Sequence, residues 1–373
     1  MFDWLLIPGL GSVLAGTAIL GFLCGTLGTF TVLRKQSLLG DSISHACLPG
    51  IILSFLIFNS KESWVLMAGA VVFGTLASLV VLAITKYSRV KEDSALAITL
   101  SVFFGFGLML LTWVQRRPDA SQAGLARFLF GQAATLLDRD VYLLAAIALP
   151  CLACVLLFWK QFQLLSFDRS FALSLGINVS FFEILLSILL VLVIVAGLET
   201  VGVVLMSALL VAPPVAARQW TNKLGMMTFL AGLFGAISGI AGAIISNLGK
   251  TSIPTGPVIV LFISAVVLLS ILFAPARGIV WQFLKQWKES GILQLDSVLS
   301  NLCNLAKEHS GKQLGHSIAM LKEISSQPAG VSKSISKLRE MALVFEVEKG
   351  FFIPTKKGET YLLNKTSQMG GSQ

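Results

Sequence analysis

The sequence predicts an all-α polytopic membrane protein with about nine transmembrane helices, followed by a small cytoplasmic domain. Of its 373 residues, 55% are hydrophobic and only 13% are charged, whereas soluble domains carry roughly 25% charged residues. Apolar segments near the length that crosses a bilayer, about 20 residues, recur as far as Phe273 and then end. Basic loops on the cytoplasmic side and a basic tail explain the formal net charge of +9 better than nucleic acid binding does.

The apolar segments are the expected spanning helices. The second and seventh are short, and they carry Pro49 and the pair Pro213 and Pro214. Spanning helices tolerate proline where they line a cavity or pack on neighbouring helices. The expected spans are Leu10–Leu33, Ser42–Phe58, Trp64–Ile84, Ala95–Val114, Val141–Trp159, Phe181–Leu198, Val201–Ala217, Leu224–Asn247 and Pro257–Phe273.

Basic residues predict the orientation of the chain. By the positive-inside rule, their excess in alternate connections and after the last span places the N-terminus outside and the C-terminus in the cytoplasm. The long fourth connection, on the opposite side, is itself rich in arginine. The cytoplasmic set is Arg34, Lys35, Lys86, Arg89, Lys91, Lys160, Arg169, Arg218, Lys223, Arg277, Lys285 and Lys288; the opposite set is Lys61, Arg116, Arg117, Arg127, Arg139 and Lys250.

Glycines recur at helix-contact spacing in two of the expected spans. Small residues on one helical face let two backbones approach closely inside a membrane. We therefore expect these glycines to serve packing and not ligand binding. They are Gly21, Gly25 and Gly28 in the first span and Gly232, Gly235, Gly239 and Gly242 in the eighth.

The stretch from Gly40 to Gly50, GDSISHACLPG, contains a candidate metal site. Asp41 and His45 are four residues apart and so share one face of a helix. Ionisable residues in a membrane-length helix are costly and usually mark a substrate or ion pathway. A carboxylate and an imidazole make a half-site for zinc, manganese or iron. The alternatives are a helix N-cap for Asp41 and a packed histidine, bonded across helices, for His45.

The predicted cytoplasmic loop from Phe167 to Asn178 contains a candidate docking helix. Its short amphipathic pattern includes Phe171, Ala172 and Leu175 and ends at Gly176, so the helix can enter a groove on a cytoplasmic partner. The alternative is an ordinary loop helix that packs on the bundle. The chain contains no GxxxxGK[ST] motif, so any ATP hydrolysis by a P-loop enzyme must come from another polypeptide.

The last quarter of the chain has a different character. We expect a transmembrane domain over residues 1–276 and an amphipathic linker helix at the membrane surface over 277–293. A winged-helix domain is expected over 294–366, because three helical patterns precede a hairpin with its turn at Lys349 and Gly350. Residues 367–373 are expected to be disordered.

Three motifs resemble the permease subunits of the ABC transporters for zinc, manganese and iron. They are GDSISHACLPG with the preceding TVLRKQSLLG, FDRSFALSLGIN at 167–178, and VGVVLMSALLVAPPVAA at 201–217. The resemblance covers roughly residues 10–275 and implies a fold like that of the type II ABC importers. It implies a transported metal at Asp41 and His45, with no stably bound cofactor. It also implies a helix that couples the permease to its ATPase, with these residues: Asp168, Phe171, Ala172, Leu175 and Gly176.

The resemblance also implies partners and a location. The chain would be a transport subunit and not an enzyme, in a bacterial plasma (inner) membrane. It would pair with a second copy or a paralogue, dock on an ABC ATPase subunit, and accept metal from an extracytoplasmic metal-binding protein. One alternative is a siderophore or corrinoid permease, which would need a wider pathway and gives no reason for the Asp41 and His45 pair. Another is a membrane-tethered winged-helix regulator whose helices only sense.

The tail carries a second resemblance. The stretch from Pro328 to Val344 resembles the recognition helix of winged-helix repressors, including the diphtheria-toxin-repressor type, and the following residues resemble the wing. If the tail binds DNA, the contacts would come from Ser332, Lys333, Ser336, Lys337 and Arg339. The alternatives are a solvated face, contact with a protein, and regulation of transport. A metal-sensor site at Cys303, His309 and His316 is a further hypothesis, although the spacing is loose.

Overall fold

The computed structural model describes the backbone of residues 10–60, 62–116, 131, 136–248, 254–308, 315–325 and 330–370. Side chains are also described, except at 204, 205, 248, 284–293, 308 and 365–370. The chain forms two compact units, Met1–Gly278 and Ile279–Gln373. The first holds the apolar segments and the second holds the tail.

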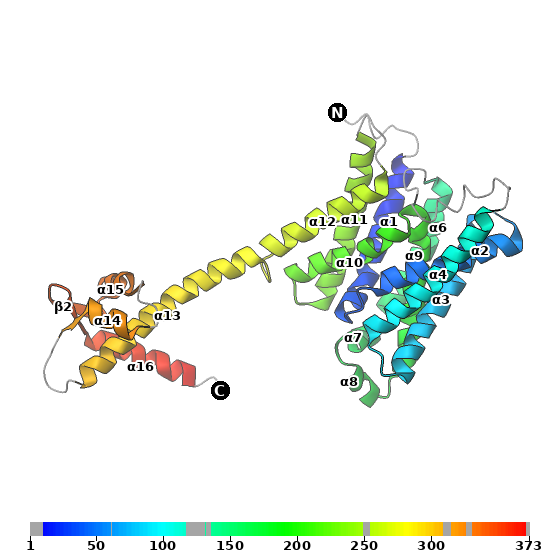
Figure 1. Ribbon diagram of the computed structural model, residues 1–373. Helices are drawn as coiled ribbons and strands as arrows, with labels where there is room; N and C mark the ends of the chain where they lie inside the picture. Colours follow the sequence, from blue (N-terminus) through cyan, green and yellow to red (C-terminus); the bar gives the residue numbers. More distant parts are fainter. Residues whose placement is uncertain are drawn as a thin grey trace. The chain divides into compact units, whose positions relative to one another are not determined.

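The first unit is a helical bundle (Figure 1). In its described part, eight helices are long and apolar enough to cross a membrane. They are α1 (Leu10–Leu33), α2 (Leu39–Phe58), α3 (Ser63–Tyr87), α4 (Glu92–Gln115), α6 (Asp138–Leu157), α9 (Val179–Thr200), α11 (Leu224–Leu248) and α12 (Thr255–Phe273). Nine were expected; the segment expected as the seventh span forms α10 (Val203–Trp220), which contains Pro213 and Pro214 and is not among the eight.

Helix α1 lies at the centre of the bundle, where it contacts α6, α9, α10 and α11. Glycines set the distance between α1 and α11, as expected from their spacing. A Cβ atom at Gly21 would lie 2.2 Å from the carbonyl oxygen of Gly235, and one at Gly25 would lie 2.2 Å from that of Ala231. Both separations are shorter than any van der Waals contact, so only glycine allows the two backbones this approach.

The core of the bundle lies between α1, α2, α9 and α10. Fully buried aliphatic side chains from these helices fill it, and Phe30 at the end of α1 packs edge-on against Trp159. Glycines also let α1 and α2 approach α10 closely. A Cβ at Gly28 of α1 would lie 1.9 Å from the carbonyl oxygen of Leu210, and one at Gly40 of α2 would lie 2.8 Å from the Leu210 side chain. Helix α10 therefore fixes both α1 and the start of α2.

The second unit packs helices on a small sheet. Strands β1 (His316–Ser317), β2 (Val344–Glu348) and β3 (Phe351–Pro354) form an antiparallel sheet in the order β1-β3-β2. The helices are α13 (Ile279–Glu308), α14 (Ile318–Ile324), α15 (Val331–Glu340) and α16 (Lys356–Gly370). Leu299, Leu302, Ile335, Leu338 and Phe352 form its core. The three expected helices and the expected hairpin are confirmed.

Two expected boundaries in the tail differ from the structure. The linker over 277–293 and the first tail helix were expected as separate elements, but α13 runs unbroken from Ile279 to Glu308. Residues 367–370 were expected to be disordered, but α16 continues to Gly370. Tyr361 and Leu362 pack on the core of this unit, and this contact outweighs the polar composition of the segment. The strand β1 was not expected.

The close packing of α1 on α11 predicts that Gly25→Ala destabilises the bundle. The added methyl group has no room beside Ala231, and overpacking of this kind costs about 1–3 kcal/mol. Thermal unfolding of the detergent-purified protein measures the effect. Gly105→Ala, on α4, is the matched control because nothing lies within 4 Å of the new Cβ. Equal unfolding temperatures for the two variants would contradict the packing account.

Candidate functional site

Asp41 and His45 lie together on α2, as their spacing predicts. The Nε2 atom of His45 is 3.5 Å from the Oδ1 atom of Asp41. The His45 side chain is 19% exposed and the Asp41 side chain 36% exposed. Ser207 of α10 also hydrogen-bonds to the Asp41 carboxylate. The carboxylate therefore has neighbours on two helices and remains partly open.

The second nitrogen of the His45 ring, Nδ1, has unsatisfied hydrogen-bonding capacity. Within the described part of the chain, Nδ1 is buried and has no hydrogen-bond partner. The ring packs edge-on against Phe104 of α4, with ring centroids 4.5 Å apart. Leaving a buried polar atom unsatisfied costs about 1–3 kcal/mol. Packing stability alone therefore does not explain a histidine at this position.

The pair lies at middle depth in the bundle. Gly74, in the middle of α3, lies against Cys47 and Ile43 of α2 and against Val191 in the middle of α9. These neighbours place the turn of α2 that carries His45 level with the centres of two spanning helices. Substrate and ion sites of transporters usually lie at this depth.

The spacing of the two side chains suits a metal ion. Two ligands of a tetrahedral ion with bonds of about 2.1 Å lie about 3.4 Å apart, close to the 3.5 Å between Nε2 and Oδ1. The described residues contain no group of three or more His, Cys, Asp or Glu side chains that could hold an ion. The pair is thus half of a ligand shell, which water, carbonyl groups or a second chain would complete. A weak, incomplete site suits an ion that must also leave.

The expected docking helix forms as α8 (Arg169–Ser174), directly after α7 (Trp159–Phe167). Asp168 begins it as the N-cap: its Oδ1 accepts a hydrogen bond of 2.9 Å from the backbone NH of Phe171. Gly176 ends it with a φ of +75°. The NH groups of Gly176 and Ile177 donate to the carbonyls of Leu173 and Ala172, which is a Schellman motif.

The two faces of α8 have different roles. Ala172 is buried against Leu165 and Val179, so it holds α8 on the bundle. Phe171 and Leu175, 50% and 56% exposed, point away from that contact, as does Leu173, 58% exposed. Exposed apolar side chains gathered on one short helix indicate a surface for a partner. The sequence pattern grouped Ala172 with Phe171 and Leu175 and did not select Leu173, whereas in the structure Ala172 faces the bundle and Leu173 is exposed.

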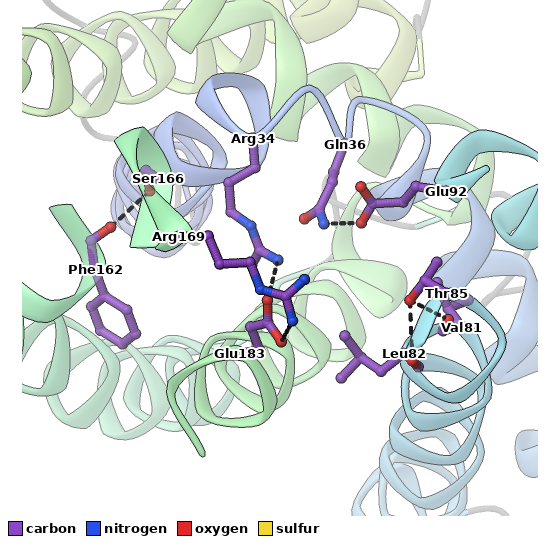
Figure 2. A network of polar contacts seen from close by, with 10 residues as sticks. All are labelled: Arg34, Gln36, Val81, Leu82, Thr85, Glu92, Phe162, Ser166, Arg169 and Glu183. Carbon is purple, nitrogen blue, oxygen red and sulfur yellow. Dashed lines mark hydrogen bonds and ion pairs between the residues drawn. The ribbon is translucent and has the colours of Figure 1, made fainter. Parts of the chain in front are cut away.

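A polar network joins α8 to other parts of the bundle, and sequence reasoning missed it (Figure 2). Glu183, near the start of α9, is 8% exposed. Its Oε2 accepts a hydrogen bond of 3.2 Å from Arg169 of α8, and its Oε1 lies 3.7 Å from Arg34, the residue after α1. The signal in the sequence was an acid within an apolar span.

Glu199 lies at the opposite end of α9 from Glu183. It accepts a hydrogen bond of 2.7 Å from the hydroxyl of Ser63, the first residue of α3. The carboxylate is thus part of a helix contact. It gives no support for a transport role.

The candidate DNA-contacting residues lie on α15. Ser332, Lys333, Ser336 and Lys337 are exposed, and Arg339 forms an ion pair with Glu346 at 2.7 Å. In the sensor hypothesis, Cys303 is buried in α13, and burial raises the pKa of its thiol. A thiol with a raised pKa is a poorer metal ligand at neutral pH. His316 lies in β1, and His309 lies outside the described residues.

The chain is similar to known membrane transport proteins. A family model described as "ABC 3 transport family" matches residues 8–274. The chain is 45% identical over 281 residues to the "Zinc transport system membrane protein TroC" of Treponema pallidum, which covers 75% of this chain and 94% of that protein. It is 38% identical over 362 residues to the "Manganese transport system membrane protein MntC" of Bacillus subtilis. That match covers 96% of this chain and 82% of the relative, so it extends into the second unit.

A solved structure is also similar. "PsaBC from Streptococcus pneumoniae in complex with Fab" matches with a TM-score of 0.65 and 33% sequence identity. The match covers 76% of this chain and 97% of the other. The similarity therefore spans an extent comparable to the first unit.

Proposed function

The chain belongs to the ABC 3 transport family, and we propose that it is the permease subunit of an importer that carries a divalent transition metal ion into the cytoplasm. The cargo belongs to the class of manganese, zinc and iron, whose ions accept carboxylate and imidazole ligands. Relatives named as zinc and manganese transport proteins support this class. The chain is not an enzyme, since in this family a separate subunit hydrolyses ATP.

One observation supports the metal assignment more than any other. Asp41 and His45 lie at middle depth, 3.5 Å apart, with an unsatisfied ring nitrogen and a partly open carboxylate. A polar pair inside an apolar bundle is retained where an ion passes. The remaining ligands would come from water, from carbonyls, or from a second permease copy or a paralogue.

The proposed assembly follows from the family and from α8. A dimer of permeases lies in the bacterial plasma membrane, with the N-terminus outside and the tail in the cytoplasm. Each permease docks on an ABC ATPase subunit through the outward face of α8, formed by Phe171, Leu173 and Leu175. An extracytoplasmic metal-binding protein delivers the ion. The similarity to PsaBC is consistent with a multi-subunit assembly.

The first test removes the metal ligands. We predict that Asp41→Asn and His45→Ala each reduce metal uptake by at least about tenfold, because the first removes the carboxylate charge and the second removes the imidazole donor of a two-ligand half-site. Uptake of radioactive manganese and zinc by cells that lack the native gene measures this. Glu199→Gln is the matched control, since it neutralises an acid at the opposite end of α9 from Glu183 that accepts a hydrogen bond from Ser63. Wild-type uptake by the two ligand variants, at equal protein levels, would contradict the metal site.

The second test concerns the outward face of α8. We predict that Phe171→Asp combined with Leu175→Asp abolishes co-purification with the ATPase subunit. The helix itself should persist, because Asp168 and the buried Ala172 are unchanged. Ala172→Arg should act differently, by displacing α8 from the bundle and lowering the unfolding temperature. Retention of the ATPase by the double variant would remove α8 from the docking site.

The tail is proposed to regulate transport or to contact a partner protein. We predict that truncation after Gly278, the end of the first unit, preserves membrane insertion and part of the uptake. The reason is that the first unit contains the complete candidate pathway, while the tail has its own core. Complete loss of uptake by a truncated chain that still reaches the membrane would show that transport requires the tail.

DNA binding by the tail is the alternative outcome. In that case the purified full-length protein would retain duplex DNA with an affinity that falls steeply as salt rises. Changing both Lys333 and Lys337 to Glu would weaken this retention, because both side chains are exposed on α15.

A further inference from the structure

Glu183 lies between the proposed docking helix and the segment that leads into the helix with the proposed metal site. On one side is α8, the proposed site of ATPase docking; on the other is the elbow formed by residues 34–38, which leads from α1 into α2. Each oxygen of the carboxylate faces a different guanidinium, Oε1 towards Arg34 and Oε2 towards Arg169 (Figure 2). The inference rests on that proposed function.

Arg34, Glu183 and Arg169 form an ionic bridge, and its Arg34 side is rigid. Helix α1 ends in a Schellman motif, in which the NH of Gln36 donates to the carbonyl of Thr31 and that of Lys35 to the carbonyl of Val32. Lys35 takes the left-handed φ of 61° that this motif requires. The Arg34 side chain is 12% exposed. Its guanidinium is therefore fixed by both backbone and burial.

The elbow is also fixed to α2 and α4. The side-chain amide of Gln36 hydrogen-bonds to Glu92, the first residue of α4 (Figure 2). The hydroxyl of Ser42 donates to the carbonyl of Leu96 at 3.0 Å. Between these two contacts, α2 begins at Leu39, and Asp41 follows in its first turn. A shift of Arg34 would thus reach the candidate metal site through one short, well-anchored segment.

The Arg169 side is at the surface. Arg169 is the first residue of α8 and its side chain is 58% exposed, whereas the Glu183 side chain is 10% exposed. A cavity of about 580 Å³ opens beside the network, lined by Arg34, Glu183, Arg169 and the end of α3 at Lys86 and Tyr87. This space lets the charged groups move without a clash.

We propose that Glu183 is a positioning residue that links the docking helix α8 to α2 through Arg34. A buried carboxylate that loses one guanidinium keeps its charge in an apolar environment, which is strongly unfavourable. When a partner displaces α8, Arg169 draws Glu183 with it, and Arg34 and the elbow follow. ATP-driven movement at the docking helix is in this way transmitted to the turn that carries Asp41.

The alternative is that the bridge only holds the start of α9 in place. The two roles differ in what a neutral substitution does. Glu183→Gln keeps the shape and one acceptor oxygen but presents an amide group to the second guanidinium. If the bridge only stabilises the fold, stability falls, and the ATP consumed per metal ion does not change. If the bridge transmits movement, the assembly forms normally and hydrolysis no longer produces transport.

The experiment uses the permease with its ATPase subunit and the metal-binding protein in proteoliposomes. Three quantities are measured: ATPase co-purification, ATP hydrolysis, and uptake of manganese and zinc. We expect Glu183→Gln to retain the ATPase and to raise the ATP hydrolysed per ion transported by about tenfold, a factor within the range of interaction energies found in one salt-bridge network. Glu199→Gln, the same substitution at the other end of α9, should leave the ratio unchanged, and Glu183→Asp should restore part of the coupling.

A second variant keeps the proposal testable if Glu183→Gln fails to fold. Arg169→Gln changes an exposed side chain, so it should fold, and we expect the same rise in the ratio. The double variant, Glu183→Gln with Arg169→Gln, should hydrolyse no more ATP per ion than either single variant, because Arg34, Glu183 and Arg169 act through one bridge. An unchanged ratio in Arg169→Gln would overturn the proposal. A wild-type assembly that transports neither metal would instead overturn the proposed function.

Discussion

The structure depends on how closely α1 approaches its neighbours. Inside a bilayer the hydrophobic effect does not drive one helix against another, so packing of small residues must do so. Gly21 and Gly25 bring α1 against α11, and Gly28 brings it against Leu210 of α10. Because Gly40 meets the same turn of α10, this contact also fixes where α2 begins. The position of Asp41 therefore follows from glycines on α1 and α2 that contribute no ligand themselves.

Buried ionisable side chains are few among the described residues of this bundle, and each has a physical cost. The His45 ring has a buried nitrogen with no partner in the described structure, and Glu183 places a carboxylate among apolar helices. A fold selected for stability alone would replace both with apolar side chains at little cost or with a gain. The location of His45 at middle depth and of Glu183 beside the proposed docking helix α8 is consistent with a pathway for a cation and with the proposed link between α8 and that pathway.

The sequence predicted those features that depend on local periodicity. Hydropathy located the spans, the four-residue spacing placed Asp41 and His45 on one face, and glycine spacing predicted close packing for α1 and α11 without indicating that they pack on each other. The Glu183 bridge could not be predicted in this way, because its partners lie 149 and 14 residues away in the sequence (183 − 34 and 183 − 169). The outward face of α8 was only half identified, since an amphipathic pattern does not state which side meets the bundle.

The tail also has features that local sequence patterns did not predict. The change in apolar pattern near Gln294 suggested a boundary, yet the backbone of α13 continues through it. Helix α16 is polar by composition, and its length is explained by Tyr361 and Leu362, which pack on residues far away in the sequence. Tertiary contacts of this kind override local composition, because burial of apolar side chains stabilises a helix more than propensity does.

The central claim is that a metal ion passes between Asp41 and His45. Anomalous scattering at the manganese and zinc edges, from crystals of the metal-loaded permease with its ATPase, tests it most directly. The account predicts a peak on α2 whose two nearest protein donors are Oδ1 of Asp41 and Nε2 of His45, each at about 2.0–2.2 Å. A metal-loaded assembly whose anomalous peaks all lie away from α2 would contradict it.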